Sequence, residues 1–228
     1  MKIVLTILAI AFQFAVFAQS AATILNNVIS KFNSVKDYTV SVNVKANIPM
    51  IKILPSKATV YFKQKDKFKV VSKGIVILPK QGFTEINTFL ADKKSYMAIE
   101  GDSAKVGGVN THQITVIPNG ESSEIVLAKL WIDSKRSVIM KSQITTKSNG
   151  TVTTLYSYGD KVNFGLPSQL VFEIDVKKFK LPKSVAADIN KTTTEKATKT
   201  KNKGSITISL TDYKVNTGLS DSIFKKEK

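Results

Sequence analysis

Cysteine is absent from the sequence, and its absence excludes several kinds of chemistry. The chain forms no disulfide, no thiolate metal site and no thiol nucleophile. Hydrophobic residues make up 43% of the chain, so core packing alone must hold the fold together. The sequence therefore predicts a domain that is stable without covalent cross-links.

Histidine, arginine and tryptophan occur once each, as His112, Arg136 and Trp131. One histidine excludes a histidine-rich metal site, and no Gly-x-Ser-x-Gly motif accompanies it for a hydrolase triad. The acids on predicted strands leave a glycosidase formally open, but their spacing selects no catalytic pair. The sequence also lacks a phosphate-binding loop and a dinucleotide fingerprint. We therefore expect no enzyme activity, no catalytic residues, no metal and no cofactor.

The first 18 residues have the features of a cleavable signal peptide. Lys2 precedes an apolar run over residues 3–17, which is too short to span a bilayer, and the small Ala18 precedes the predicted cleavage site. An uncleaved membrane anchor is the alternative. The sequence thus predicts a signal peptide at 1–18, one domain over 19–228, and a periplasmic location.

Basic residues outnumber acidic residues by 34 to 17, which gives a formal net charge of +17. In an exported protein this charge favours phospholipid headgroups, lipopolysaccharide or acidic partners, and we expect no nucleic acid partner. An alternative is that the charge only keeps the protein soluble. Nine lysines lie between residues 177 and 203, a stretch with little to place in a core, which we interpret as a mobile basic loop. The predicted anionic-surface residues are Lys177, Lys178, Lys180 and Lys183.

The spacing of apolar residues predicts one amphipathic helix followed by many strands. Residues 20–35 carry apolar positions at helical spacing, and the period changes to two from Tyr38 onward. Residues 83–92 fit either a short helix or a loop. We expect a turn at Gly101-Asp102. The other predicted strands cover about 59–63, 68–72, 96–99, 111–117, 124–133, 138–147, 151–158, 169–176 and 204–213.

A sheet of this size with one apolar face must close, pair with a second sheet, or leave a concave apolar surface. A single obvious helix is available to cover it, and a concave apolar surface is suited to binding lipid. We expect the acyl-binding residues to be Val40, Val42, Val60, Phe62, Phe68 and Trp131. Core packing is the alternative role for Trp131. We expect the covering helix to contribute Ile24, Leu25, Val28 and Phe32.

Several short motifs occur in an order typical of one family. They include Val60-Tyr61-Phe62-Lys63, Leu130-Trp131-Ile132-Asp133, Tyr158-Gly159-Asp160 and Gly165-Leu166-Pro167. In this order the chain resembles the LolA-like outer-membrane lipoprotein carrier proteins and their lipoprotein-sorting branch. The resemblance implies a mainly β fold with few helices (α+β). It takes the form of a strongly curved, unclosed antiparallel β-barrel that helices cover, with an apolar cavity for acyl chains.

The resemblance also implies a function. It implies a periplasmic carrier or chaperone that binds the acyl chains of lipoproteins during outer-membrane lipoprotein sorting. Its expected partners are an acylated lipoprotein or lipid, an inner-membrane transporter and an outer-membrane receptor, and we expect a monomer. In the carrier proteins an arginine before the second hairpin strand helps to hold the covering helix, whereas this chain has Gln64-Lys65-Asp66-Lys67-Phe68 there. The alternatives are an envelope-stress sensor, or a module that binds anionic membrane or lipopolysaccharide, on the same scaffold.

Overall fold

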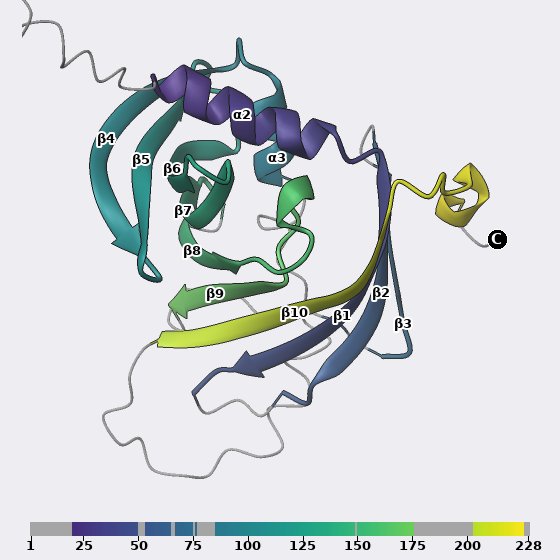
Figure 1. Ribbon diagram of the computed structural model, residues 1–228. Coiled ribbons are helices and arrows are strands. Elements are labelled where there is room, and N and C mark those ends of the chain that lie inside the picture. Colours follow the sequence, from purple (N-terminus) through teal and green to yellow (C-terminus); the bar gives the residue numbers. More distant parts are fainter. Residues whose placement is uncertain are drawn as a thin grey trace, which may run out of the picture.

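The computed structural model describes residues 20–49, 53–64, 67–74, 76, 85–148, 150–175 and 203–225. Within these residues, ten antiparallel strands form one open sheet, and two α-helices cover one mouth of it (Figure 1). None of the helices in this part of the chain is long and apolar enough to cross a membrane. The helices are α2 (Ala21–Asn33), α3 (Glu85–Ala91) and the 3-10 turns η2 (Val162–Phe164) and η3 (Asp221–Phe224). The strands are β1 (Asp37–Asn47), β2 (Ser56–Lys63), β3 (Lys67–Ser72), β4 (Tyr96–Val106), β5 (Val109–Pro118), β6 (Ile125–Asp133), β7 (Val138–Thr146), β8 (Gly150–Ser157), β9 (Gln169–Asp175) and β10 (Lys203–Val215).

The strand order is β3-β2-β1-β10-β9-β8-β7-β6-β5-β4. The last strand, β10, lies between β1 and β9, so the two ends of the domain meet in the middle of the sheet. Strands β3 and β4 follow each other along the chain yet are the two edge strands of the described sheet. The predicted fold class is therefore confirmed, because the sheet is antiparallel, curved and unclosed, and helices cover it (Figure 1).

Helix α2 forms where the helical spacing predicts it. The Oγ of Ser20 accepts a hydrogen bond from the backbone N–H of Thr23 at 3.3 Å, which satisfies one free donor at the helix start. Lys31 lies in the last turn, where a cation interacts favourably with the helix dipole. The segment 83–92, which fits either a helix or a loop by sequence, contains the helix α3 over Glu85–Ala91.

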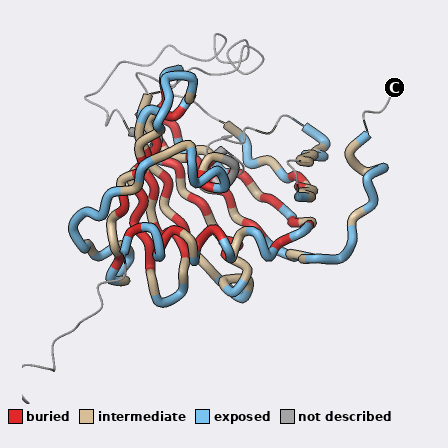
Figure 2. The backbone as a smooth tube through the Cα atoms, turned by 90° about the horizontal axis from the view of Figure 1, so that it is seen from above, coloured by how far each residue is buried: buried red, intermediate tan, exposed pale blue. Residues whose placement is uncertain are grey.

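The core lies on the inner, concave face of the sheet. Buried residues run along the strands and exposed residues gather in the turns (Figure 2). Because directly paired residues of antiparallel strands share a face, the register defines one continuous inner row across the sheet. That row contains Ala46, Ile206, Phe172, Thr154, Ser142, Leu130 and Ile114.

The structure corrects the expected turn at Gly101-Asp102. Strand β4 continues through these residues to Val106, with a register shift between Glu100 and Ser103 that accommodates them as a bulge. The chain reverses instead at Gly107-Gly108, whose φ angles of 57° and 80° match a two-residue hairpin turn. Both turn positions need a positive φ, which two successive glycines adopt at little cost.

Asp221 connects the C-terminal segment to the β2–β3 hairpin. Its carboxylate lies 2.6 Å from the Nζ of Lys63 and 2.8 Å from the Nζ of Lys67. Hydrogen bonds from these two ammonium groups lower the pKa of Asp221 from 3.8 to about 2. The carboxylate is therefore charged, and the contact intact, at neutral pH.

The lowered pKa of Asp221 predicts how stability depends on pH. A carboxyl group with a lower pKa in the folded chain stabilises the fold above its unfolded pKa, and this contribution is lost as the pH falls through the folded value. The stability difference between the natural protein and Asp221→Asn should therefore be constant above about pH 5 and shrink between about pH 4 and pH 2. Urea unfolding of both proteins across this range measures it. A difference that does not change with pH would contradict the assignment.

Two predicted segments lie outside the described residues. They are the signal peptide at 1–18 and the basic loop at 177–203, of which only Lys203, the first residue of β10, is described. The domain boundaries and the anionic-surface lysines Lys177, Lys178, Lys180 and Lys183 therefore remain predictions.

Candidate functional site

Two helices cover the inner face of the sheet. The apolar side of α2 is directed inward, and Ile24, Leu25 and Val28 are almost completely buried. Helix α3 contacts α2 and buries Ile86 and Leu90 in the same cluster. The side chains of the helices and of the inner face thus form one continuous apolar interior.

Five of the six predicted acyl-binding residues lie on the inner face of β1, β2 and β3. Val40 is paired with Val60, and Val42 with Ala58, and these four side chains are buried. Phe62 is paired with Phe68 at the α2 end of the hairpin, and both are half-buried. The Phe62 ring stacks on the Tyr38 ring with a centroid distance of 5.0 Å. The structure therefore brings these five residues together as one wall of the interior.

Trp131 is not part of that wall. It is paired with Gln113 and Lys141, whereas its neighbour Leu130 occupies the inner row. The Nζ of Lys141 lies 4.5 Å from the centre of the Trp131 ring, and this cation–π contact covers the ring on the outer face. Trp131 is thus buried by packing outside the main core cluster, on the other side of the sheet from the predicted acyl site.

The four predicted helix residues divide into two groups. Ile24, Leu25 and Val28 are buried against the sheet, while Phe32 is half-buried. A Cβ added at Gly165 would lie 3.3 Å from the Phe32 ring, so this ring packs against the turn after η2. Phe32 therefore lies at the rim of the interior.

The C-terminal half of α2 is held by residues other than an arginine before the second hairpin strand. The Nε2 of Gln64 donates a hydrogen bond to the carbonyl of Asn33 at 2.8 Å. The Nζ of Lys31 donates to the carbonyl of Arg136, in the turn between β6 and β7. Desolvation, and then the charge of Arg136, lower the pKa of Lys31. These two contacts fix the end of the helix that leads into β1.

Three buried hydroxyl groups on the inner face were not anticipated from the sequence. Ser142 and Thr154 occupy the inner row, and the Ser142 Oγ lies 3.1 Å from the Tyr156 hydroxyl. Burial raises the pKa of Tyr156, so this hydroxyl is neutral. One feature of the sequence could have indicated the burial of Ser142. The alternation in β7 places it on the same face as Ile144. The interior therefore combines an apolar wall with a small, uncharged polar cluster.

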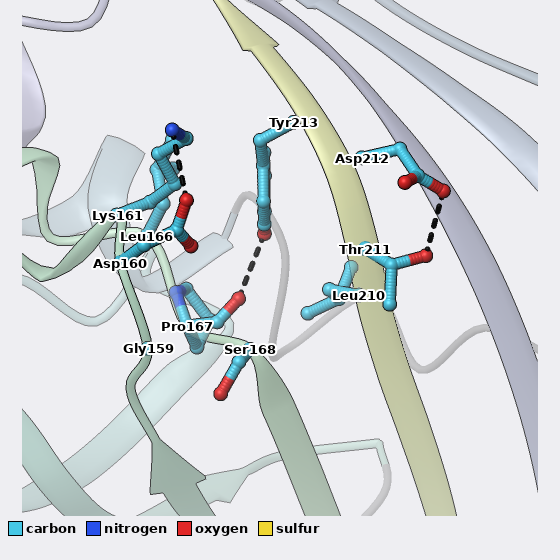
Figure 3. Close-up of a pocket in the computed structure, with 10 residues that line it drawn as sticks. All are labelled: Gly159, Asp160, Lys161, Leu166, Pro167, Ser168, Leu210, Thr211, Asp212 and Tyr213. Atoms are coloured by element: carbon cyan, nitrogen blue, oxygen red, sulfur yellow. Dashed lines mark hydrogen bonds and ion pairs between the residues drawn. The ribbon is translucent and has the colours of Figure 1, made fainter.

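A pocket of about 240 Å³ opens between β10 and the turn that precedes β9 (Figure 3). The Tyr213 hydroxyl donates to the carbonyl of Pro167 at 2.9 Å across it, and Asp160 pairs with Lys161 at 2.9 Å. Asp212 has a φ of 56° at the point where β10 is out of register with β1. This volume is below the roughly 300–1,000 Å³ of typical ligand pockets, so we do not place an acyl chain here.

The described residues show no arrangement that suggests catalysis. The Nδ1 of His112 lies 3.6 Å from the Glu100 carboxylate on an exposed part of β4 and β5, which makes a surface ion pair if the histidine is protonated. No group of three or more potential metal ligands occurs in the part of the chain that the structure describes. The inner face is therefore the candidate site.

Comparisons of sequence find no match among family models or curated proteins. Comparisons of structure do. A LolA superfamily protein from Nitrosomonas europaea aligns with a TM-score of 0.58 and 14% identity, over 92% of this chain and 99% of that one. A DUF1329 family protein from Desulfovibrio piger aligns with a TM-score of 0.57 and 11% identity, over 90% and 97%.

A third solved structure is also similar to this chain. A putative outer-membrane lipoprotein-sorting protein domain from Vibrio parahaemolyticus aligns with a TM-score of 0.51 and 10% identity, over 90% of this chain and 97% of that one. These likenesses extend over nearly the whole length of each protein. The chain therefore has the LolA-like fold, as its motifs suggest.

Proposed function

We propose that this protein binds acyl chains between the inner face of its sheet and helix α2. The observation that carries the proposal is the apolar side of α2, which lies buried on the apolar inner face of a curved, open sheet. The fold it shares with LolA superfamily and lipoprotein-sorting proteins supports the same proposal. The proposed cargo is the acylated end of a lipoprotein, or a lipid, and the proposed location is the periplasm.

The tight packing of α2 implies that an acyl chain enters by replacing it. Burial of Ile24, Leu25, Val28 and Ile29 contributes about 6–12 kcal/mol in total. An acyl chain of about 14 to 16 methylenes gains roughly 11–13 kcal/mol when it leaves water. The two quantities are similar, so α2 and an acyl chain can exchange places on the sheet at little net cost.

The chemistry of the interior fits binding without reaction. The wall offers aliphatic and aromatic side chains, and the Ser142, Thr154 and Tyr156 hydroxyls are neutral hydrogen-bonding groups. An ester or amide carbonyl at the head of an acyl chain is a natural acceptor for such hydroxyls. In this proposal the protein is a carrier or chaperone in lipoprotein sorting. It would receive cargo from an inner-membrane transporter and deliver it to an outer-membrane receptor.

Phe62 provides a test of the binding wall. Phe62→Ala removes a half-buried ring that stacks on Tyr38, and should weaken uptake of a fluorescent fatty acid by roughly thirty-fold, because about 2 kcal/mol of apolar burial is lost. The matched control is Tyr61→Ala, which removes a ring from the outer face of the same strand. Titration of each purified protein with the fluorescent fatty acid measures the affinity.

Equal uptake by Phe62→Ala and Tyr61→Ala would contradict the proposed wall. Mass spectrometry of the protein purified from its native envelope provides a second, independent test. It should detect copurified acyl species, and their repeated absence together with no uptake in vitro would refute acyl binding. Trp131→Phe should leave uptake unchanged, because this ring lies on the outer face.

A further inference from the structure

The connection between β1 and β2 has an unusual sequence for a turn. Residues 48–55 read Ile-Pro-Met-Ile-Lys-Ile-Leu-Pro, with a single charge and no Gly, Asn, Asp or Ser. Connections between strands are normally built from those polar and small residues, because they lie in water. An apolar connection of this kind therefore needs either burial in the core or an apolar partner.

The structure shows that the ends of this connection differ in burial. Ile48 is buried and Ile53 packs partly against the core. A Cβ at Gly204 would lie 3.1 Å from the Asn47 carbonyl oxygen and 3.3 Å from the Ile48 Cα, so β10 passes directly against the end of β1. Leu54, in contrast, is 75% exposed. The base of the connection is thus fixed to the sheet, while a large apolar side chain projects into water.

Exposed lysines surround this position on the outer face of the hairpin. Lys45 near the end of β1 and Lys57 at the start of β2 are both exposed, and Lys73 follows β3. None of the three forms an ion pair with another described residue. Val71 of β3, on the same outer face, is also exposed. We call the set Lys45, Leu54, Lys57, Val71 and Lys73 the hairpin tip.

Acidic residues are scarce near the hairpin tip. Strands β1, β2 and β3 contain a single acid, Asp37, which is buried at the opposite end of β1. On the outer face, the acids of β9 are Glu173, two strands away from Asn47 in the pairing row, and Asp175, which is paired with Lys203. Strand β10 begins at this end with Lys203, because Ser205 of the same strand pairs with Asn47. This end of the sheet is therefore apolar at its tip and positively charged around it.

We propose that the hairpin tip docks on an anionic lipid bilayer, with Leu54 inserted between the headgroups and the lysines facing the phosphates. A bilayer surface places an apolar layer directly beneath a layer of negative charge, and the hairpin tip has the complementary arrangement. An acidic protein would satisfy the lysines but would leave the projecting leucine without a pocket. The lipid surface is therefore the partner that the observed residues favour.

Docking at the hairpin tip is independent of acyl binding. Helix α2 packs at the other end of β1, so a protein held by its hairpin tip keeps α2 free to move (Figure 1). A protein could dock without binding acyl chains, or bind acyl chains without docking. Loss of one activity is therefore distinguishable from loss of the other.

Flotation of the full mature protein with vesicles tests the proposal. The protein should float with vesicles of phosphatidylcholine and phosphatidylglycerol, and much less with phosphatidylcholine alone. Leu54→Asp should reduce the bound fraction roughly ten-fold or more, at low and at high salt, because the apolar contact is lost. Lys45→Gln combined with Lys57→Gln should reduce it by about an order of magnitude at low salt only, because salt screens charge.

The matched control is Met97→Asp, which adds the same charge at an exposed apolar residue of the other edge strand, β4. It should float like the unaltered protein. Leu54→Ser provides a neutral second variant, and circular dichroism checks that every variant is folded. The proposal is overturned if the unaltered protein does not float with the anionic vesicles. It is also overturned if Leu54→Asp floats normally while deletion of residues 177–202 abolishes flotation, or if Met97→Asp loses as much as Leu54→Asp.

Discussion

Val28→Asp should detach α2 from the sheet and lower the free energy of unfolding by about 3–5 kcal/mol, the range for an uncompensated buried charge. Val28 is fully buried on the inner side of α2, and every neighbouring side chain of that helix face is apolar. A carboxylate there has no partner, so the helix must leave the interior or the domain must unfold. The exposed inner face should then bind a hydrophobic dye.

Asn27→Asp is the control for this experiment. It adds the same charge to the adjacent residue of α2, which is exposed, and should change stability by less than about 0.5 kcal/mol. Urea unfolding gives the stability of each protein, and dye fluorescence in the absence of urea reports whether α2 is detached. Equal stability of the two variants would mean that α2 does not pack on the sheet as described here.

Asp37→Ala should lower the free energy of unfolding by about 2–4 kcal/mol, because a buried carboxylate that accepts several hydrogen bonds is removed. Asp37 is 4% exposed, and its carboxylate accepts hydrogen bonds from the backbone N–H groups of Thr217 and Gly218 at 2.9 and 3.0 Å. The Asn216 side chain accepts a bond from the Lys36 N–H at 2.7 Å beside it. These contacts join the end of β10 to the junction of α2 and β1.

The control for Asp37→Ala is Asp221→Ala, in the same C-terminal segment. Asp221 makes exposed ion pairs, and such pairs contribute little to stability, so this change should have a much smaller effect. Guanidinium or thermal unfolding of both variants measures the difference. A cost for Asp37→Ala as small as that for Asp221→Ala would show that the buried carboxylate does not hold the two segments together.

The fold was predictable where a single period dominates the sequence. Residues 20–35 have apolar side chains at helical spacing, and α2 occupies Ala21–Asn33. The alternation from Tyr38 onward corresponds to β1, and the four predicted strands between 124 and 176 correspond to β6, β7, β8 and β9. In each of these segments local preference and tertiary burial agree, which is why a pattern alone was sufficient.

The errors arise where tertiary structure decides between two local options. Gly101-Asp102 is a reasonable turn, but pairing with β5 carries β4 through it as a bulge. For Trp131 the residue type suggested the interior, and only the register of β6 with β5 and β7 shows that the ring lies outside. Register depends on the partner strands, so a single strand read alone does not reveal which face it buries.

The buried polar cluster was missed for a similar reason. Ser142 and Thr154 are small polar residues, which usually occupy the solvent side of a strand. Their burial follows from their neighbours in the inner row, Leu130 and Phe172, which belong to other strands. The sequence therefore predicted which residues of β1, β2 and β3 share the inner face and missed the hydroxyl groups on that face.

The placement of β3 and β4 at opposite edges has a mechanical consequence. A closed barrel has its circumference set by a complete ring of hydrogen bonds, whereas in the described sheet β3 and β4 are not paired with each other and residues 73–95 connect them along the chain. Small changes in twist, summed over ten strands, can therefore widen or narrow the mouth without breaking any pairing. Because α3 lies in the connection between the two edges and contacts α2, which also contacts β4, widening of the mouth is coupled to the helices that cover it.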